Sequence, residues 1–106
     1  MAQVKNLTLT GASRRTFSFQ AFPWGTKFNP SGAVYAILKQ TPTGHYSVIY
    51  IGQTSDLSKR FENHHQQECF DRNGKSHIAV YPVSGESRRF DIETDLLRSY
   101  KPVCND

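Results

Sequence analysis

The sequence predicts an α+β fold: a small sandwich in which helices flank a central three-stranded antiparallel sheet, with an additional N-terminal β-hairpin. Three short runs are rich in β-branched and aromatic residues, which favours strands. Two longer runs repeat apolar residues every three or four positions, which is typical of helices. In chain order the predicted core is β-β-α-β-α, over residues 33–38, 46–51, 55–66, 77–83 and 86–100.

The N-terminal part of the chain precedes this core. Residues 4–22 predict a hairpin, because apolar residues that alternate with polar ones lie on either side of the turn-prone run Thr10–Ser13. Pro and Gly punctuate the segment that follows, which predicts a loop. We therefore divide the chain into a hairpin and loop extension, residues 1–32, and a core, residues 33–106, which together form one compact domain.

Turn and cap residues set the order of the core elements. A polar turn joins the first two core strands, so we expect them to pair as an antiparallel hairpin. Thr54 or Ser55 is the expected N-cap of the first helix, and residues 71–75 are the expected turn before the third strand. Pro102 is expected to stop the second helix.

Charge and cysteine content restrict the class of protein. The formal net charge is +4 and the sequence pI is about 9.3, which mildly favours a polyanionic partner. No apolar run has the length of a membrane span or the character of a signal peptide, so we expect a cytoplasmic protein with no membrane partner. Cys69 and Cys104 lack metal-type spacing and are too few for a disulfide framework, so we expect both thiols to be reduced.

Glu93 is the clearest anomaly in the pattern, because it falls within an apolar stripe of the second predicted helix. That stripe consists of Phe90, Glu93, Leu97 and Tyr100. A buried carboxylate without a partner is costly, so Glu93 should have a partner, a bound cation or access to a cleft. The alternatives are a salt bridge to Arg89 or Arg60, or a position at the edge of the stripe that reaches solvent.

Arg60 and two tyrosines are further candidates. Arg60 lies beside the apolar face of the first helix, where its guanidinium could fork two hydrogen bonds onto a phosphate; an exposed helix flank is the alternative. Tyr35 and Tyr50 lie on paired strands, where packing in the core is the default role of either one. A phenol has an unperturbed pKa of about 10, so a basic role needs a nearby cation.

The histidines after Arg60 allow two interpretations. We place His64 as a neighbour of Arg60 on the same helix. Zinc binding is the alternative, since ligand types recur here about one helical turn apart, at His64, His65, Glu68 and Cys69. No second group of ligands with a closing spacing is visible in the sequence, so we do not favour zinc.

Five segments in this order resemble the GIY-YIG nuclease superfamily, over residues 33–105. The first and second segments are similar to the two tripeptides that name the superfamily. The third is similar to its arginine-bearing helix, the fourth to its glutamate-bearing helix and the fifth to its terminal Pro-x-x-Asn segment. These segments are Ala33–Tyr35, Tyr50–Gly52, Leu57–His64, Arg89–Leu97 and Lys101–Asn105.

The resemblance implies a metal-dependent endonuclease that hydrolyses phosphodiester bonds, most simply in DNA. Glu93 would hold one divalent ion, Mg²⁺ or Mn²⁺, and Tyr35 or Tyr50 would activate or position the attacking water. Arg60, with His64 as its neighbour, would stabilise the developing charge, and Asn105 would support the site. The alternative is a catalytically inactive module on the same scaffold that binds nucleic acid or another protein.

Contacts to the nucleic acid are expected from several further residues. Lys59 precedes Arg60, and Gln53 stands where repair-type members of the superfamily carry a lysine. The N-terminal extension could present Arg14, Arg15 and Lys27 to phosphates. It could instead form a dimer contact or cover a sheet edge, and we prefer edge cover. No separate recognition domain fits in the chain, so a partner protein could supply recognition.

Overall fold

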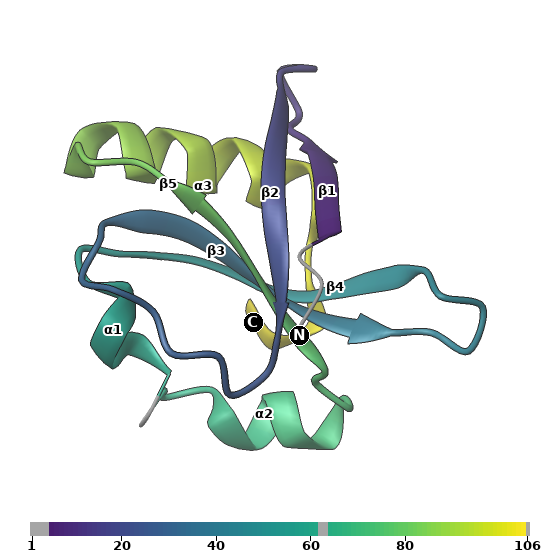
Figure 1. Ribbon diagram of the computed structural model, residues 1–106. Coiled ribbons are helices and arrows are strands. Elements are labelled where there is room, and N and C mark those ends of the chain that lie inside the picture. The colour runs from purple at the N-terminus through teal and green to yellow at the C-terminus, as the bar shows by residue number, and fades with distance from the viewer. Residues whose placement is uncertain (1–4, 62–63, 106) are drawn as a thin grey trace.

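A computed structural model of the protein describes residues 5–61 and 64–105. Its sheet has five antiparallel strands in the order β1-β2-β5-β3-β4 (Figure 1). The strands are β1 (Lys5–Thr10), β2 (Thr16–Pro23), β3 (Ala33–Gln40), β4 (Tyr46–Thr54) and β5 (His77–Pro82). The helices are α1 (Leu57–Arg60), α2 (Gln67–Arg72), α3 (Glu86–Tyr100) and the short 3-10 segment η1 (Val103–Asn105).

The predicted α+β class is confirmed, with a wider sheet than expected. The β1–β2 hairpin does not stand apart, because β2 pairs with β5 from Gln20↔Val80 to Pro23↔His77. This pairing occupies backbone N–H and C=O groups that would otherwise lie on an open strand edge. The predicted hairpin thus extends the sheet; Val4, with which the prediction began, lies outside the described residues.

Two apolar clusters lie on opposite faces of the sheet, one under α3 and one toward α1 and α2. Successive residues of β3 alternate between them: Val34 faces α3, and Tyr35 faces α1 and α2. Both faces are covered, so residues 33–38 have no exposed side-chain surface. Burial on both sides explains why this strand is an unbroken apolar run in the sequence.

The prediction of one helix over residues 55–66 is wrong. Helix α1 ends after one turn with Phe61 as its C-cap, and α2 begins at Gln67. Between them His64 is buried, with only 4% of its surface exposed. Its carbonyl accepts from the Gln67 N–H at 3.0 Å, and its Nδ1 accepts from the Gln66 N–H at 3.0 Å. These bonds satisfy the backbone where the helix is interrupted.

The caps and turns around these two helices also differ from the prediction. Asp56, rather than Thr54 or Ser55, is the N-cap of α1, because its Oδ1 accepts the Ser58 N–H at 2.9 Å. The expected turn at 71–75 is shorter, since α2 continues to Arg72.

Helix α3 has the expected bounds but a different buried face. Ile92 and Leu96 lie in the core, whereas Phe90, which we predicted to be buried, is 46% exposed. Glu93 is therefore half-buried at the margin of this face. The helix ends at Lys101, a left-handed C-cap with φ of 48°, before Pro102.

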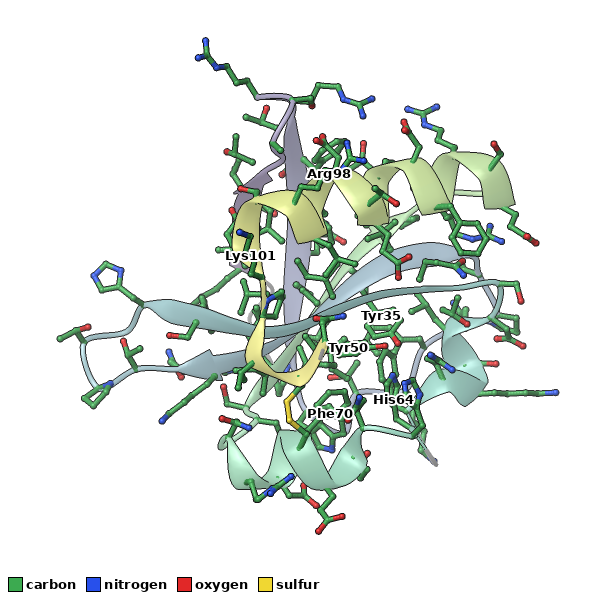
Figure 2. All side chains as sticks on the ribbon, turned by 180° about the vertical axis from the view of Figure 1, so that it is seen from behind. Tyr35, Tyr50, His64, Phe70, Arg98 and Lys101 are labelled. Atoms are coloured by element: carbon green, nitrogen blue, oxygen red, sulfur yellow. A yellow bond between two sulfur atoms is a disulfide. The ribbon has the colours of Figure 1, made fainter. Side chains whose placement is uncertain are left out.

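Cys69 and Cys104 form a disulfide, so the prediction of two reduced thiols is wrong (Figure 2). The bond joins α2 to η1 across 35 residues of sequence, with the two Cα atoms 5.9 Å apart. That separation lies in the range that a disulfide spans, and it arises from the tertiary fold. An oxidised Cys69 also removes one ligand from the zinc alternative.

The described part of the chain contains no helix that could span a membrane. Within residues 5–61 and 64–105, no helix combines the length and the apolar content that a bilayer span requires.

Candidate active site

Tyr35 lies at the centre of a hydrogen-bonded cluster on the α1 and α2 side of the sheet. Its Oη accepts the Arg60 Nε–H at 2.9 Å and lies 2.7 Å from His64 Nε2. Because His64 Nδ1 already accepts a backbone N–H, the proton of the neutral imidazole belongs on Nε2, which then donates to Tyr35. The Tyr35 oxygen therefore accepts two hydrogen bonds, and its own O–H remains to donate.

His64 is neutral in this setting. Burial, helped by the positive charge of Arg60, lowers the pKa of its imidazole to about 4. Its ring lies against Tyr50 and Phe70, with centroid separations of 4.9 and 4.8 Å. Figure 2 shows these rings together below the sheet. His64 is thus a fixed hydrogen-bond donor to Tyr35 at neutral pH.

Gly52 makes room for this arrangement. It is the register partner of Tyr35 in the β3–β4 pair. A Cβ at position 52 would lie 2.7 Å from Tyr35 Oη and 2.8 Å from Tyr50 Cε2, which is closer than real contacts allow. In the Tyr-Ile-Gly tripeptide, Tyr50 and Gly52 face the cluster, whereas Ile51 lies in the core under α3.

Tyr50 is the second phenol of the cluster. Its ring centroid lies 6.0 Å from that of Tyr35, and 7% of its surface is exposed, whereas Tyr35 has none. Burial raises the pKa of both phenols, and in Tyr35 the raise is large despite the hydrogen bond from Arg60. Both are therefore neutral at pH 7, and neither is a ready base in the metal-free chain.

Glu93 lies on α3, which packs against the edge strand β4. Burial raises the pKa of its carboxyl group, and the positive charge of Arg60 opposes that rise. Its own negative charge in turn raises the pKa of Tyr50. Among the residues that the structure describes, its carboxylate has no hydrogen-bond or ion-pair partner.

Arg89, one of the partners we considered for Glu93, is occupied elsewhere. Its Nε donates to Gln53 Oε1 at 3.0 Å, and its Nη1 donates to the carbonyls of Val83 and Ser84 at 3.0 and 2.9 Å. These bonds explain how an arginine is accommodated with 4% of its surface exposed. They also occupy the side-chain oxygen of Gln53, which we expected to face nucleic acid.

Asn105 holds the strand that carries Tyr50. Its Oδ1 accepts the Ile51 N–H at 2.9 Å, and its Nδ2 donates to the Ile51 carbonyl at 2.8 Å. The amide thus pairs with the edge of β4 as a neighbouring strand would. Its chain neighbour Cys104 is tied to α2, which fixes η1 from the other side.

The basic residues expected at nucleic acid lie in different places. Arg15 pairs with Asp91 of α3 at 3.3 Å, and Arg14 lies exposed in the hairpin turn with φ of 73°. Lys59 is exposed on α1 beside Arg60. Lys27 is exposed in the loop after β2, where it lines a pocket. These contacts to nucleic acid remain predictions.

Sequence reasoning missed two parts of the cluster. Phe70 packs its ring against both His64 and Tyr50, and the Gln66 N–H fixes the His64 tautomer. Neither has a local signal, because both depend on the chain leaving the helix between α1 and α2. Gly52 belonged to the tripeptide, but the reason for a glycine there is visible only from the Tyr35 hydroxyl beside it.

A metal ion at this site would have one protein carboxylate. Within the described residues, no three side chains of His, Cys, Asp or Glu gather in a way that could hold a metal ion. Glu93 alone suits Mg²⁺, which keeps several of its waters and binds through one or two carboxylates. It does not suit zinc, which requires three or four protein ligands.

Comparison of the chain with protein-family models, with curated proteins and with solved structures gives no match.

Proposed function

We propose that this protein is a metal-dependent endonuclease of the GIY-YIG type, which hydrolyses phosphodiester bonds, most simply in DNA. The observation that carries the proposal is the hydrogen-bonded cluster of Arg60, Tyr35 and His64 with Tyr50 beside it, on which the charge of Glu93 also acts. Helix α1 supplies Arg60, the β3–β4 pair supplies Tyr35 and Tyr50, and α3 supplies a carboxylate without a described partner, Glu93. Such a group of cation, hydroxyls and carboxylate suits a phosphodiester substrate.

Arg60 is the proposed anchor of the scissile phosphate. Its Nε is held by Tyr35, and its terminal nitrogens make no hydrogen bond to other described residues. They are therefore free to donate to two oxygens of one phosphate, which offsets the charge that builds up in the transition state. Tyr35 and His64 are positioning residues here, since they fix the guanidinium.

Tyr50 is the proposed contact of the attacking water. It is the less buried of the two phenols, and the charges of Arg60 and Glu93 both influence its pKa. As a neutral phenol, Tyr50 would orient the water by a hydrogen bond and would not remove its proton. The proton would leave to solvent or to a phosphate oxygen.

Glu93 is the proposed ligand of one Mg²⁺ or Mn²⁺. The bound ion would lower the pKa of a water and neutralise charge on the phosphate. Glu93 must be ionised to bind it, and burial raises the pKa of this carboxyl group. Activity should therefore require more metal as the pH falls toward that pKa.

A second candidate is a nucleic-acid-binding module without catalysis. The raised pKa of both phenols favours it, because neither tyrosine offers a base to activate water in the metal-free chain. This candidate predicts salt-sensitive binding of DNA that needs no divalent ion and no Glu93 carboxylate.

Cleavage assays with matched variants test the proposal. Supercoiled and branched DNA are incubated with the protein in Mg²⁺, in Mn²⁺ or in a chelator. We expect cleavage with either metal and none with the chelator, and a loss of at least about 100-fold in Glu93→Gln and in Arg60→Lys.

The controls are Glu68→Gln on α2 and Arg88→Lys on α3, which make the same chemical changes at exposed positions. Both should cleave as the wild type does. If the wild type leaves every substrate intact but binds it in a salt-dependent manner, the second candidate replaces the first. If Glu93→Gln cleaves at the wild-type rate, the assignment of the site is wrong.

A further inference from the structure

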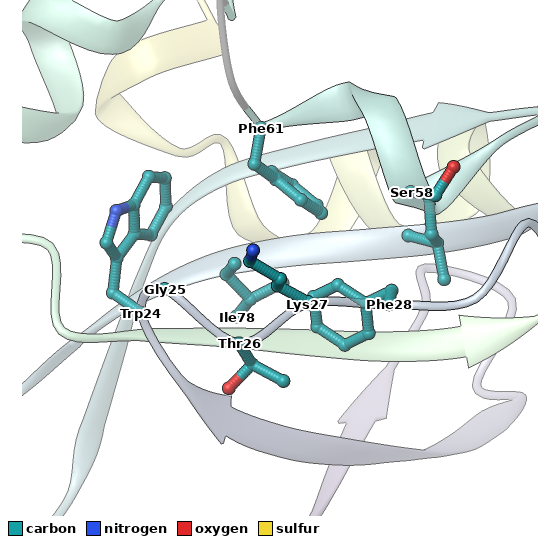
Figure 3. A pocket seen from close by; sticks show the side chains of 9 residues that line it. Trp24, Gly25, Thr26, Lys27, Phe28, Ser58, Phe61 and Ile78 are labelled. Atoms are coloured by element: carbon teal, nitrogen blue, oxygen red, sulfur yellow. The ribbon is translucent and has the colours of Figure 1, made fainter.

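A pocket of about 310 Å³ lies between the loop after β2 and helix α1, next to the proposed site (Figure 3). Its size is at the small end of the range for ligand pockets, enough for one planar heterocycle. The lining combines aromatic, aliphatic and polar groups: Trp24, Gly25, Thr26, Lys27, Phe28, Leu57, Ser58, Phe61 and Ile78.

Three aromatic rings form the walls of the pocket. The ring of Phe61 lies 5.9 Å from that of Phe28 and 6.1 Å from that of Trp24, measured between centroids. All three are half-buried, whereas Leu57 and Ile78 beneath them are almost fully buried. The rings therefore keep accessible surface above a closed apolar floor, which suits stacking of a flat ligand.

The mouth of the pocket carries a positive charge. Lys27 is exposed there, and within residues 5–61 and 64–105 its amine forms no ion pair. A purely apolar ligand would gain nothing from this amine, whereas a nucleotide would present its phosphate to it. Charge and aromatic surface together favour a nucleobase attached to a polyanionic backbone.

One aromatic ring of the pocket contacts the proposed active site. The ring of Phe61 meets that of Tyr35 edge-on at 5.1 Å, and the guanidinium carbon of the preceding residue, Arg60, lies 5.9 Å from the same Tyr35 ring. A base beside Phe61 would thus bring the adjoining phosphate toward Arg60.

We infer that this pocket is a subsite for one unpaired nucleobase, stacked among Trp24, Phe28 and Phe61 next to the phosphate held by Arg60. The inference rests on the proposed function for its substrate class, and it adds that the substrate must offer a base outside a duplex. Single-stranded, branched or unpaired segments meet this requirement, and continuous duplex does not.

Trp24 provides a direct readout, because it is the single tryptophan of the chain. Its fluorescence is titrated in a chelator, so that no cleavage occurs, with a short single-stranded oligodeoxynucleotide. A second titration uses an oligomer of the same length in which every base is replaced by an abasic residue. We expect the base-bearing oligomer to quench Trp24 and to bind on the order of tenfold more tightly than the abasic one.

Phe28→Leu tests the stacking wall, since it keeps apolar volume but removes the ring. The matched control is Phe90→Leu, the same change at an exposed position on α3. We expect Phe28→Leu to erase most of the preference for the base-bearing oligomer and Phe90→Leu to leave it intact. Equal binding of both oligomers by the wild type, or an unchanged preference in Phe28→Leu, overturns the inference.

The outcome separates this inference from the proposed function. Metal-dependent cleavage without any preference for bases would refute the subsite and leave the nuclease standing. Base-dependent quenching without cleavage would refute the nuclease and leave a nucleobase site on a binding module.

Discussion

Gly52 is important because of the neighbouring strand, where the phenol of Tyr35 fills the space that a Cβ at position 52 would need. Glycine usually weakens the interior of a strand, so its replacement by alanine would ordinarily be neutral or favourable. Here the close approach of Tyr35 Oη and Tyr50 reverses that expectation. The glycine of the tripeptide is thus a requirement of the hydroxyl cluster itself.

Gly52→Ala should lower the free energy of unfolding by about 1–3 kcal/mol, because the new methyl group must displace Tyr35 or Tyr50. Urea denaturation measures the change. Gly85→Ala is the control for crowding, since the nearest atom to a Cβ there is Arg88 Cβ at 3.9 Å; because Gly85 is the N-cap of α3, we expect a smaller loss there and not none. Equal stability of the two variants would show that the cluster tolerates a side chain at position 52.

His64 makes stability depend on pH. Its pKa is about 4 in the folded protein, below the ordinary value of 6.5, so the unfolded chain binds a proton at a pH where the folded protein does not. Stability is then fully present above pH 6.5 and is lost as the pH falls toward 4. The loss from this residue is on the order of 3 kcal/mol.

His64→Gln should remove that part of the pH dependence, measured as the free energy of unfolding between pH 7.5 and 4.5. His45→Gln, at an exposed position, should keep it. Parallel curves for the wild type and His64→Gln would mean that His64 is not held neutral.

Strands were predictable because their signals are local. The runs at 33–38 and 46–51 pair as expected, with longer bounds, since β-branched and aromatic content and an intervening polar turn indicate a hairpin without help from the rest of the chain. The pairing of β2 with β5 had no such signal, because the partners are distant in sequence. It depends on which edge of the core sheet the hairpin meets.

Helices α1 and α2 show where a local pattern fails. Leu57, Phe61 and His64 have a spacing that suits one continuous helix, and the structure instead buries His64 by interrupting it. Tertiary contacts of His64 with Tyr35, Tyr50 and Phe70 outweigh the local preference for a continuous helix. Arg60 and His64 each form a hydrogen bond with Tyr35, although they do not share the helix on which we placed them.

On helix α3 the buried face is adjacent to the stripe that we predicted to be buried. Arg89 lies on the buried stripe, where Gln53 and two carbonyls satisfy its guanidinium. Ile92 and Leu96 therefore face the core, and Glu93 lies at their margin, which was among the alternatives considered. That position leaves its carboxylate reachable from solvent and so from a metal ion.

At the scale of the whole molecule, the N-terminal hairpin belongs to the same folding unit as the rest. It pairs with β5, and Leu9, Phe17 and Phe19 contribute to the cluster under α3. Its turn is also fixed to α3, where Asp95 accepts from the Ser13 N–H at 2.8 Å and from the Ser13 hydroxyl at 2.6 Å. The hairpin is thus bound at both its strand and its turn.

A fragment of residues 33–106 should therefore fail to fold. It would expose the β5 edge and leave the α3 cluster without its N-terminal residues. Circular dichroism and thermal melting should show no cooperative transition. The control is full-length Ser13→Ala, which loosens only the turn and should melt cooperatively at a slightly lower temperature. A cooperative melt of the fragment would mean that the hairpin is an independent addition.

The Cys69–Cys104 bond has a practical consequence for every assay described above. It adjoins Asn105, which holds Ile51 and with it the strand of Tyr50, and on its other side it adjoins Phe70. A buffer with a thiol reductant and one without therefore contain two different molecules, one with the C-terminal segment tied to α2 and one with it released. These predictions apply to the oxidised protein. It should be purified without a thiol reductant, and mass spectrometry should confirm that the Cys69–Cys104 disulfide is present.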